Sequence, residues 1–484
     1  MFDTRLFTFM LACAAFLDGQ GQDFSGSNRS TLDRLQYDVP PATGPLTPHP
    51  QNARYFADAS GKPVYLVGSH TWSNFQDYRM EGDLAFDYDH YIAFMVDNHF
   101  NFMRLWTWEH AAWTSWSPEK TIVDPMPYRR AGPGLALDGK PKFDLSQFEP
   151  SYFDRLRARI LKARNKGIYA SIMFFQAFSG VWPKGGKTFG YDVFAGHYYN
   201  KDNNIQKLDG DKNKDKVLDI DDPKVREYQA AYIKKIIDTV WDLDNVLYEV
   251  INEGGNVEWD AFVIKTVKDY EKTKERQHPI GLTGHGNETL QQMMASNADW
   301  VSPGTADDAS MKNAAANPPL WKGVKVSVLD TDHIWGHGID YRWVWKSFLR
   351  GHNVLFMDPW DPLPVWFNPA VNRPDHPNYI LGRNAMKYSA EWAKKIDLVT
   401  MQPNPDFGAE SFCLGLSGKE YLLYVNGSNP TLDFTNLGGN FSVEWIHLTE
   451  GTVVHDKAVA GGQKQNFRNP FTGEAILHLE LTDQ

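Results

Sequence analysis

The chain has 484 residues, 42% of them hydrophobic, and a formal net charge of −11 at pH 7. Its length exceeds one ordinary domain, so two domains with a sizeable core are expected. The acidic balance, without a basic cluster, argues against a nucleic-acid-binding surface, and no segment beyond the N-terminus is apolar over the ~20 residues that a membrane span needs.

The N-terminal segment has the order of a secretory signal. Arg5 precedes an apolar run over residues 6–17, and Asp18-Gly19-Gln20-Gly21 follows. This order predicts a signal peptide at residues 1–22 and a secreted or periplasmic protein. Cys13 follows Met-Leu-Ala in a loose lipobox-like pattern, so a lipoprotein is the alternative.

The sequence has two cysteines, and a segment rich in turn residues follows the predicted signal peptide. Cys13 and Cys413 are the two cysteines of the sequence, which excludes a disulfide framework. Residues 23–50 are rich in Gly, Ser, Pro and Asp and are predicted to be a linker or an N-terminal arm.

Short apolar runs alternate with helical patterns between residues 51 and 400. The eight runs are Val64–Gly68, Phe100–Trp106, Ile168–Phe174, Val246–Ile251, Pro279–Thr283, Ala298–Ser302, Val324–Asp330 and Asn353–Met357, with helical patterns such as 152–165, 224–241 and 259–274 between them. Strands that alternate with helices predict parallel pairing through right-handed crossovers. Eight repeats predict an α/β fold, a closed (β/α)8 TIM barrel over residues 51–400.

The pattern changes after residue 400. Residues 421–425, 441–445 and 475–481 alternate on a period of two and are separated by Gly, Asn and Pro turns. Residues 401–484 are therefore predicted to form a small all-β sandwich, an accessory domain; the alternative is an extension of the barrel.

Polar and aromatic residues follow the predicted strands. The carboxyl ends of barrel strands face the active site in such enzymes, so these residues are the candidates for substrate binding. Each residue taken alone also has a structural interpretation, such as an Asp that caps a helix or a Trp that packs in the core. The candidates are His70, Trp72, Arg104, Trp106, Asn252, His285, His333, Trp335, Asp358 and Trp360.

Two strand ends carry carboxylates. Strand four ends in Asn-Glu-Gly, and the apolar neighbours of Glu253 would raise its pKa and suit a general acid/base. Strand seven ends at Asp330, which Arg104 would hold in the ionised form. Glycoside hydrolysis uses such a pair, and the strand order fits a retaining mechanism with Asp330 as nucleophile. Asp332 is the rival, less favoured because Asp330 is nearer the sheet.

An active-site metal is the alternative use of the Asp-Thr-Asp-His sequence at residues 330–333. Ligand spacing such as His-x-x-x-His is missing, so no catalytic cofactor is expected.

These residues carry a family resemblance. Arg104 in strand two, Asn252-Glu253 after strand four and an acid after strand seven resemble clan A glycoside hydrolases of the cellulase-like superfamily. Residues 56–66 and 68–72 look more specifically like a bacterial, apiosidase-related group that carries a C-terminal β-domain labelled collagen-binding. The resemblance implies the barrel and a two-carboxylate hydrolase; the label is no evidence of collagen binding. Clan A nucleophiles are usually Glu, whereas strand seven here offers Asp.

Residues 211–222 have the spacing of an EF-hand-type calcium loop. The predicted ligands are Asp211, Asn213, Asp215, the carbonyl of Val217, Asp219 and Asp222. Lys216 stands where a Gly is wanted, and the last ligand is Asp rather than Glu. The alternative is a solvated loop in which Asp221 or Asp222 caps the following helix. Any calcium here would be structural.

The sequence as a whole predicts a secreted glycoside hydrolase that acts on a plant or algal polysaccharide or oligosaccharide. The 17 Trp suit sugar stacking, although a large barrel also buries aromatic residues. The main alternative is a non-catalytic carbohydrate- or matrix-binding protein on a degenerate barrel. A polysaccharide lyase is a third reading, disfavoured by the acidic chain.

Overall fold

The computed structural model describes residues 39–482 except 115–119, 181–192, 211–215, 285–288, 305–310, 312, 361–373 and 409–411. The predicted signal peptide, Cys13 and the first part of the predicted linker lie outside the described residues. The chain divides into two compact units, residues 1–38 and 39–484, and the second holds every element described below.

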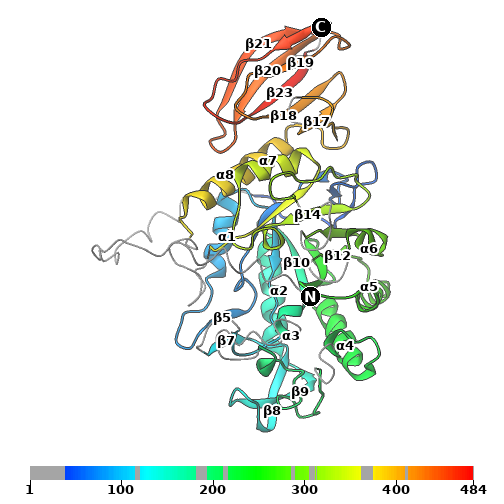
Figure 1. Cartoon of the computed structure of the whole chain (residues 1–484). Helices are drawn as coiled ribbons and strands as arrows, with labels where there is room; N and C mark the ends of the chain where they lie inside the picture. The colour runs from blue at the N-terminus through cyan, green and yellow to red at the C-terminus, as the bar shows by residue number, and fades with distance from the viewer. Residues whose placement is uncertain are drawn as a thin grey trace, which may run out of the picture. The chain divides into compact units, whose positions relative to one another are not determined.

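Eight parallel strands close into a barrel, which confirms the predicted (β/α)8 fold (Figure 1). They are β4 (Val67–His70), β6 (Phe102–Leu105), β10 (Tyr169–Gln176), β11 (Val246–Asn252), β12 (Ile280–Thr283), β13 (Trp300–Ser302), β14 (Val326–Asp330) and β15 (Asn353–Met357). Each overlaps a predicted run. The first begins later than predicted because Val64 pairs with Phe56 in a small antiparallel sheet of β1 (Thr47–Pro48), β2 (Phe56–Ala57) and β3 (Pro63–Val64).

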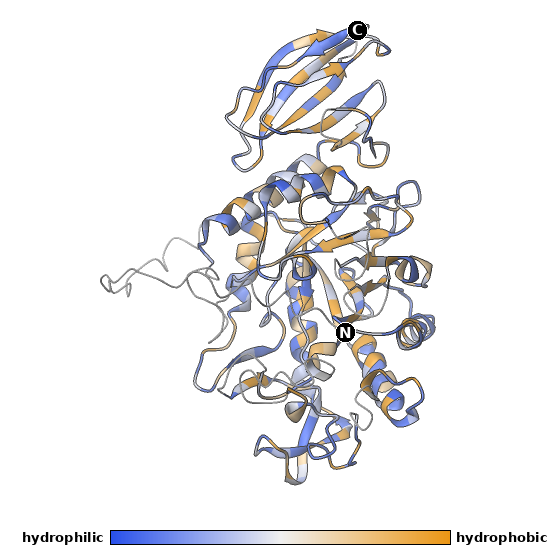
Figure 2. Cartoon of the chain, in the orientation of Figure 1, coloured by the Kyte–Doolittle hydropathy of each residue, from blue (hydrophilic) through white to orange (hydrophobic). Residues whose placement is uncertain are grey.

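Amphipathic helices cover the barrel. They are α1 (Tyr88–Asp97), α2 (Pro150–Arg164), α4 (Pro223–Val240), α5 (Val257–Glu271), α6 (Leu290–Ala295), α7 (Tyr341–Leu349) and α8 (Pro377–Ala393), with the single turn α3 (Ala177–Gly180). In α4, Val225, Ile233 and Ile237 are buried on one face. Figure 2 shows the same division, with hydrophobic colour along the barrel strands and mixed colour on the helices. No helix among the described residues is long and apolar enough to cross a membrane.

The barrel interior changes from apolar to charged along the strands. Phe102, Leu247 and Val328 meet in one buried cluster with residues of three further barrel strands, which is geometrically feasible only inside the barrel. Successive side chains of a strand point to opposite faces, so the residue two positions further along each strand also faces inward. Those residues are Arg104, Glu249 and Asp330. A charged layer therefore lies directly above the apolar one.

The segment between β6 and α2 holds antiparallel strands that the sequence patterns did not predict. Strand β7 (Thr121–Asp124) pairs with β5 (Asp77–Met80), and β8 (Tyr128–Leu135) pairs with β9 (Pro141–Phe148). Gly132, Pro133 and Gly134 interrupt the alternation in β8, which is why it gave no strand signal. These strands support a second buried cluster that includes Trp72, Trp106 and Trp108.

The C-terminal β-domain has a six-stranded antiparallel sheet in the order β16-β17-β18-β23-β20-β21 and a two-stranded sheet of β19 and β22. The strands are β16 (Gln402–Pro403), β17 (Cys413–Leu416), β18 (Glu420–Val425), β19 (Thr431–Asp433), β20 (Asn440–His447), β21 (Val453–Ala460), β22 (Lys464–Asn466) and β23 (Ala475–Thr482). Alternation divides the large sheet between two cores. Leu423 and Leu477 belong to the core of the domain itself, whereas Leu422 and Ile476 belong to the cluster that includes the barrel helices.

Candidate active site

Arg104 joins three barrel strands at the charged layer. Its Nε donates to Glu249 Oε2 at 2.7 Å and its Nη2 donates to the other oxygen of that carboxylate. Nη2 also donates to Asn252 Oδ1 at 2.7 Å, and Nη1 donates to Asp330 Oδ2 at 3.1 Å. Burial alone would lower the pKa of Arg104, but Glu249 and the other carboxylates raise it. Arg104 is therefore a permanent cation whose three guanidinium nitrogens all donate hydrogen bonds.

The Asp330 carboxylate accepts three hydrogen bonds. Its Oδ1 accepts from His70 Nε2 at 3.0 Å and from the backbone N–H of Asp332 at 3.0 Å, while Arg104 occupies Oδ2. The hydrogen bond that the sequence predicted between Arg104 and Asp330 is confirmed. Burial would raise the pKa of Asp330, but His70 and Arg104 together lower it below its ordinary value. This carboxylate is 1% exposed and stays ionised.

Glu253 has an unusual backbone conformation. It follows the last residue of β11 with φ of 53°, in the left-handed region that disfavours residues other than Gly. The next residue is Gly254, where an added Cβ would lie 2.2 Å from the Cβ of Ala177. A strained non-glycine residue at a strand end motivates a functional hypothesis, because a glycine would relieve the strain.

Glu253 and Asp332 share an environment that disfavours two charges. Burial is the main cause that raises the pKa of Glu253 to about 7, Asp330 adds to it, and Arg104 opposes it. Burial likewise raises the pKa of Asp332 well above its ordinary value, with Glu253 and Asp330 as further causes. Like charges in a desolvated site suppress each other's ionisation. Glu253 and Asp332 therefore titrate as a pair that retains a proton near neutral pH.

Polar side chains of neighbouring strand ends are hydrogen-bonded to Asn252 and Glu249. Asn252 Oδ1 lies 3.2 Å from His333 Nε2, and Asn252 Nδ2 donates to Gln176 Oε1 at 3.1 Å. Thr283 Oγ1 donates to Glu249 Oε1 at 2.7 Å. The amide of Asn252 is thus fixed in orientation by partners on three sides.

Most predicted site residues on β4, β6, β11 and β14 come together. His70, Arg104, Asn252, Asp330, Asp332 and His333 are joined by the contacts above. The ring of Trp106 stacks on His70 with centroids 5.0 Å apart, and Trp72 lies 5.9 Å from Trp106. Trp335 is 38% exposed and rests edge-on against Trp343.

The predicted residues after β15 make different contacts. Asp358 accepts two hydrogen bonds from Arg383 of α8, the first from Nε at 2.8 Å. Trp360 packs against the rings of Phe86 and Tyr91. Neither joins the Arg104 contacts described above. His285 lies outside the described residues.

Glu249 and His337 are residues that sequence reasoning missed. Glu249 stands inside an apolar strand, two positions after the inward-facing Leu247, and a buried carboxylate needs a cation. Arg104 is the matching cation in β6, so the two together were a detectable signal. The ring of His337 lies 5.3 Å from Trp72; its surroundings in sequence gave no such signal.

The predicted calcium loop is described in part, since Asp211, Asn213 and Asp215 lie outside the described residues. The carbonyl of Val217 accepts from Gln229 Nε2 at 2.6 Å. Asp222 caps α4 by accepting from the backbone N–H groups of residues 224 and 225. Within the described residues, no three metal-ligating side chains are grouped as a metal site.

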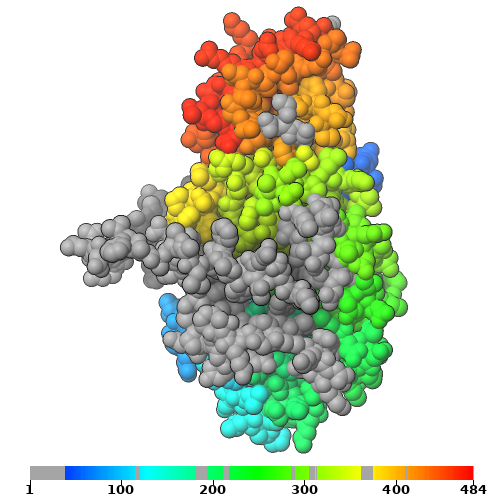
Figure 3. All heavy atoms as spheres, in the orientation of Figure 1, coloured from blue at the N-terminus to red at the C-terminus, as the bar shows by residue number. Residues whose placement is uncertain are grey.

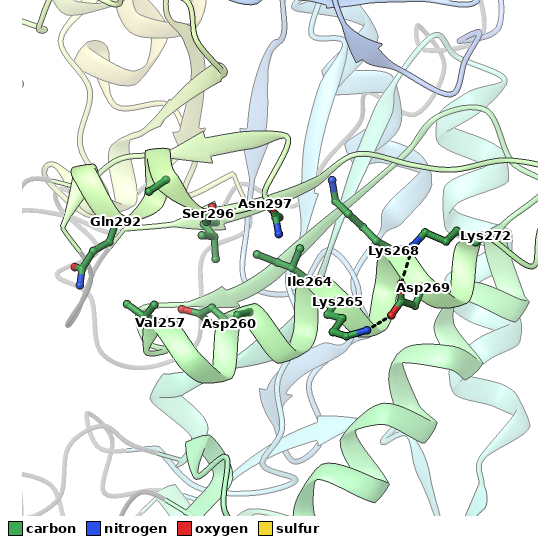
Figure 4. Close-up of a pocket in the computed structure, with 13 residues that line it drawn as sticks. Val257, Asp260, Ile264, Lys265, Lys268, Asp269, Lys272, Gln292, Ser296 and Asn297 are labelled. Atoms are coloured by element: carbon green, nitrogen blue, oxygen red, sulfur yellow. Dashed lines mark hydrogen bonds and ion pairs between the residues drawn. The ribbon is translucent and has the colours of Figure 1, made fainter.

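A groove of about 570 Å³ lies between α5 and α6, away from these residues (Figure 4). Lys265 and Lys272 both pair with Asp269, and Lys268 pairs with Asp299 outside the set that lines the groove. Its lysines are paired with carboxylates. None of Glu249, Glu253, Asp330 and Asp332, here called the acid cluster, lines the groove.

Comparison with known proteins identifies the fold. A family model described as a domain of unknown function (DUF6298) matches residues 114–298, and a search of curated proteins finds no match. A solved structure described as a glycoside hydrolase is similar with a TM-score of 0.60 at 11% identity, covering 91% of this chain and 98% of that chain. A family 5 glycoside hydrolase from Bacteroides vulgatus has a TM-score of 0.59 at 12% identity, covering 92% and 95%. The chain therefore has the fold of these glycoside hydrolases along most of its length.

Proposed function

We propose that the chain is a glycoside hydrolase in which Glu253 is the general acid/base and a strand-seven aspartate is the second carboxylate. The observation that carries the proposal is the coupling of Glu253 and Asp332 beside Arg104: burial and neighbouring negative charge raise both pKa values, that of Glu253 to about 7. Two carboxyl groups that share one proton supply the protonated acid and the ionised nucleophile that glycoside hydrolysis requires. The fold of the similar structures supports the same reaction class.

We assign the nucleophile to Asp332, in place of the Asp330 favoured by the sequence. Asp330 accepts three hydrogen bonds and is 1% exposed. The Asp332 side chain is 8% exposed, and within the described residues its Oδ2 accepts no hydrogen bond. Arg104 Nη1 lies 3.6 Å from that oxygen and acts to lower the pKa of Asp332, against burial and the charges of Glu253 and Asp330, which raise it. Asp330 then holds the Asp332 backbone in place through its N–H.

The two carboxylates divide the chemistry in a retaining mechanism. Protonated Glu253 donates its proton to the glycosidic oxygen as a carboxylate oxygen of Asp332 bonds to the anomeric carbon. The bond to the leaving group breaks, and the leaving group departs as an alcohol. Glu253, now ionised, takes a proton from water, whose oxygen displaces Asp332 and releases the sugar. The proton that the coupled pair retains near pH 7 serves the first step.

The substrate is proposed to be a plant or algal polysaccharide or oligosaccharide, in line with the resemblance to the apiosidase-related group. Trp335 supports a sugar-binding face, since an exposed indole stacks on the apolar face of a pyranose or furanose. Trp335 follows Asp332 by three residues in the same segment, and we propose that it binds a sugar next to the reacting one.

Two further proposals rest on the sequence alone. The order of residues 1–22 supports export to the periplasm or the exterior, with lipid attachment at Cys13 as the alternative. The oxygen spacing of residues 211–222 supports a structural Ca²⁺ ion.

A panel of aryl glycosides and plant and algal polysaccharides tests the reaction class. We expect hydrolysis of at least one substrate, and proton NMR should show that the first-formed anomer retains the configuration of the substrate. Binding of a polysaccharide without turnover would replace the proposal by the non-catalytic alternative. An inverted first product would remove the covalent step.

A further inference from the structure

Helix α7 lies between the acid cluster and the β-domain. Residues 330–340, here called the site segment, run from the end of β14 to Asp340, which caps α7 by accepting from the backbone N–H of Arg342. Trp343 and Trp345 are two positions apart, about 200° around a helix at 3.6 residues per turn. They therefore lie on opposite faces of α7.

One face of α7 packs on the β-domain. Trp345 Nε1 donates to the carbonyl of Leu448 at 2.9 Å, and Lys346 and Arg350 lie over the ring of Phe412. Figure 3 shows the yellow-green atoms of this part of the barrel adjoining the orange atoms of the β-domain. The contact is thus a packed interface with apolar, cation–π and hydrogen-bonded parts.

Glu474 of the β-domain forms hydrogen bonds with two residues in the first turn of α7. Its Oε1 accepts from Arg342 Nε at 2.5 Å, and its Oε2 accepts from the hydroxyl of Tyr341 at 3.3 Å. Burial would raise the pKa of Glu474, but the hydrogen bond from Arg342 lowers it, so the side chain is anionic. Charge-assisted bonds of this kind fix geometry more firmly than neutral ones.

The other face of α7 supports the exposed indole of the site segment. The ring of Trp335 meets the buried ring of Trp343 edge-on, with centroids 5.2 Å apart and planes at 75°. The backbone N–H of Trp335 donates to the carbonyl of Thr331 at 2.8 Å, inside the turn that carries Asp332. A shift of the first turn of α7 would therefore move the Trp335 indole through its contact with Trp343, without requiring a shift of the barrel strands.

We propose that the β-domain positions the substrate-stacking side of the active site, with Glu474 as a positioning residue that acts on Trp335 through the first turn of α7. This inference rests on the proposed glycosidase function. It gives the β-domain a role in the reaction that requires no sugar-binding surface of its own.

A double-mutant cycle on the full chain tests the coupling. Glu474→Ala should raise KM for an oligosaccharide about fivefold, the scale of a lost partly exposed ion pair, with kcat on a short aryl glycoside unchanged. Trp335→Ala should raise KM by more, and adding Glu474→Ala to it should cause no further loss, since coupled residues are non-additive. Glu480→Ala, on the exposed face of β23, is the matched control and should leave KM unchanged. Additive losses would overturn the proposal.

A second measurement does not depend on activity. Comparison with Trp335→Phe isolates the fluorescence of Trp335, and its quenching by iodide reports the exposure of the indole. Glu474→Ala should change that quenching, and Glu480→Ala should not. Unchanged quenching in Glu474→Ala would overturn the positioning role even if the enzyme is active. Altered quenching in a protein that hydrolyses no glycoside would reject the proposed function while keeping the mechanical link.

Discussion

The barrel and the β-domain each bury a charge cluster, and the two are built differently. In the β-domain, His478 lies between two glutamates, with Nε2 2.9 Å from Glu420 and Nδ1 2.9 Å from Glu444. Both ring nitrogens of His478 have a partner, and the exposed His455 also lies 3.1 Å from Glu444, so two histidines face two acids. In the barrel, Glu249, Glu253, Asp330 and Asp332 share the single guanidinium of Arg104.

The difference separates a structural cluster from a catalytic one. In the β-domain, burial would lower the pKa of His478, but its two glutamates raise it, so the cluster favours its charged state. In the barrel, burial and mutual repulsion raise the pKa values of Glu253 and Asp332, so the ionised forms of these two acids are disfavoured. A buried acid whose pKa is shifted towards neutrality is a candidate for proton transfer in a reaction, whereas a pKa shift that favours the charged, paired form serves stability.

The largest expected effect is on turnover in Glu253→Gln. Loss of the proton donor should lower kcat on an unactivated glycoside by about 10²–10⁴-fold, with no loss of thermal stability because a disfavoured charge is removed. The acid must be protonated to act, so kcat/KM of the unmodified enzyme should fall as pH rises past about 7. Steady-state kinetics across pH 5–9 should show that this alkaline limb is absent in the variant. A retained limb would exclude Glu253 as the acid.

A large loss of stability is expected in Glu249→Gln. This carboxylate and Arg104 are both buried and bonded through two hydrogen bonds, and breaking a buried pair costs about 3–5 kcal/mol. Urea denaturation measures the free energy of unfolding. Glu258→Gln, on the exposed start of α5, is the control and should change it little. Equal stability of the two variants would mean that Arg104 is held by its other partners alone.

A smaller, pH-dependent loss is expected in His478→Gln, with activity at saturating substrate unchanged. The pKa of His478 is raised in the folded state, so its stabilisation is complete below the unfolded value of about 6.5 and is lost as pH rises through the folded value. Hydrogen bonds to charged groups contribute about 1.5–3 kcal/mol. The melting temperatures of the two proteins should therefore differ most near pH 5.5 and converge at alkaline pH. A constant difference would reject the linkage.

The smallest effect concerns the loop at residues 211–222. Asp222→Ala removes the cap of α4 and should cost about 1 kcal/mol. The Ca²⁺ ion proposed for this loop would add stability by mass action, so EDTA should lower the melting temperature of the unmodified protein and leave that of Asp222→Ala unchanged. The same loss from Asp222→Ala with EDTA and with Ca²⁺ would show that Asp222 acts as a helix cap alone.

The barrel was predictable because its signal is local and repeated. Runs such as Ile168–Phe174 are almost continuously apolar, which is typical of a parallel strand covered on both sides. The strands β7, β8 and β9 escaped prediction because they lie in one insertion between β6 and α2, and Gly132, Pro133 and Gly134 interrupt β8. Strand β5 is short and lies between β4 and α1. Their pairing is set by tertiary contacts rather than by periodicity.

The candidate site was predictable in its residues and less so in their arrangement. Glu253 stood out because a carboxylate at a strand end has no packing use. The relation between Asp330 and Asp332 did not, because it depends on a hydrogen bond between them and on His70, which is 260 positions away in the sequence. Glu249 was overlooked since its partner Arg104 belongs to another strand.

Trapping the covalent intermediate tests the central claim most directly. A 2-deoxy-2-fluoro glycoside of the identified substrate, with an activated leaving group, should form a stable glycosyl-enzyme that intact-mass spectrometry detects. Trypsin releases residues 326–342 as one peptide, because Lys325 and Arg342 are the cleavage sites that flank both aspartates. The account predicts that fragmentation places the sugar on Asp332 and that Asp332→Asn carries none. A sugar on Asp330 would reverse the assignment of the two aspartates, and a sugar outside this peptide would contradict the proposed site.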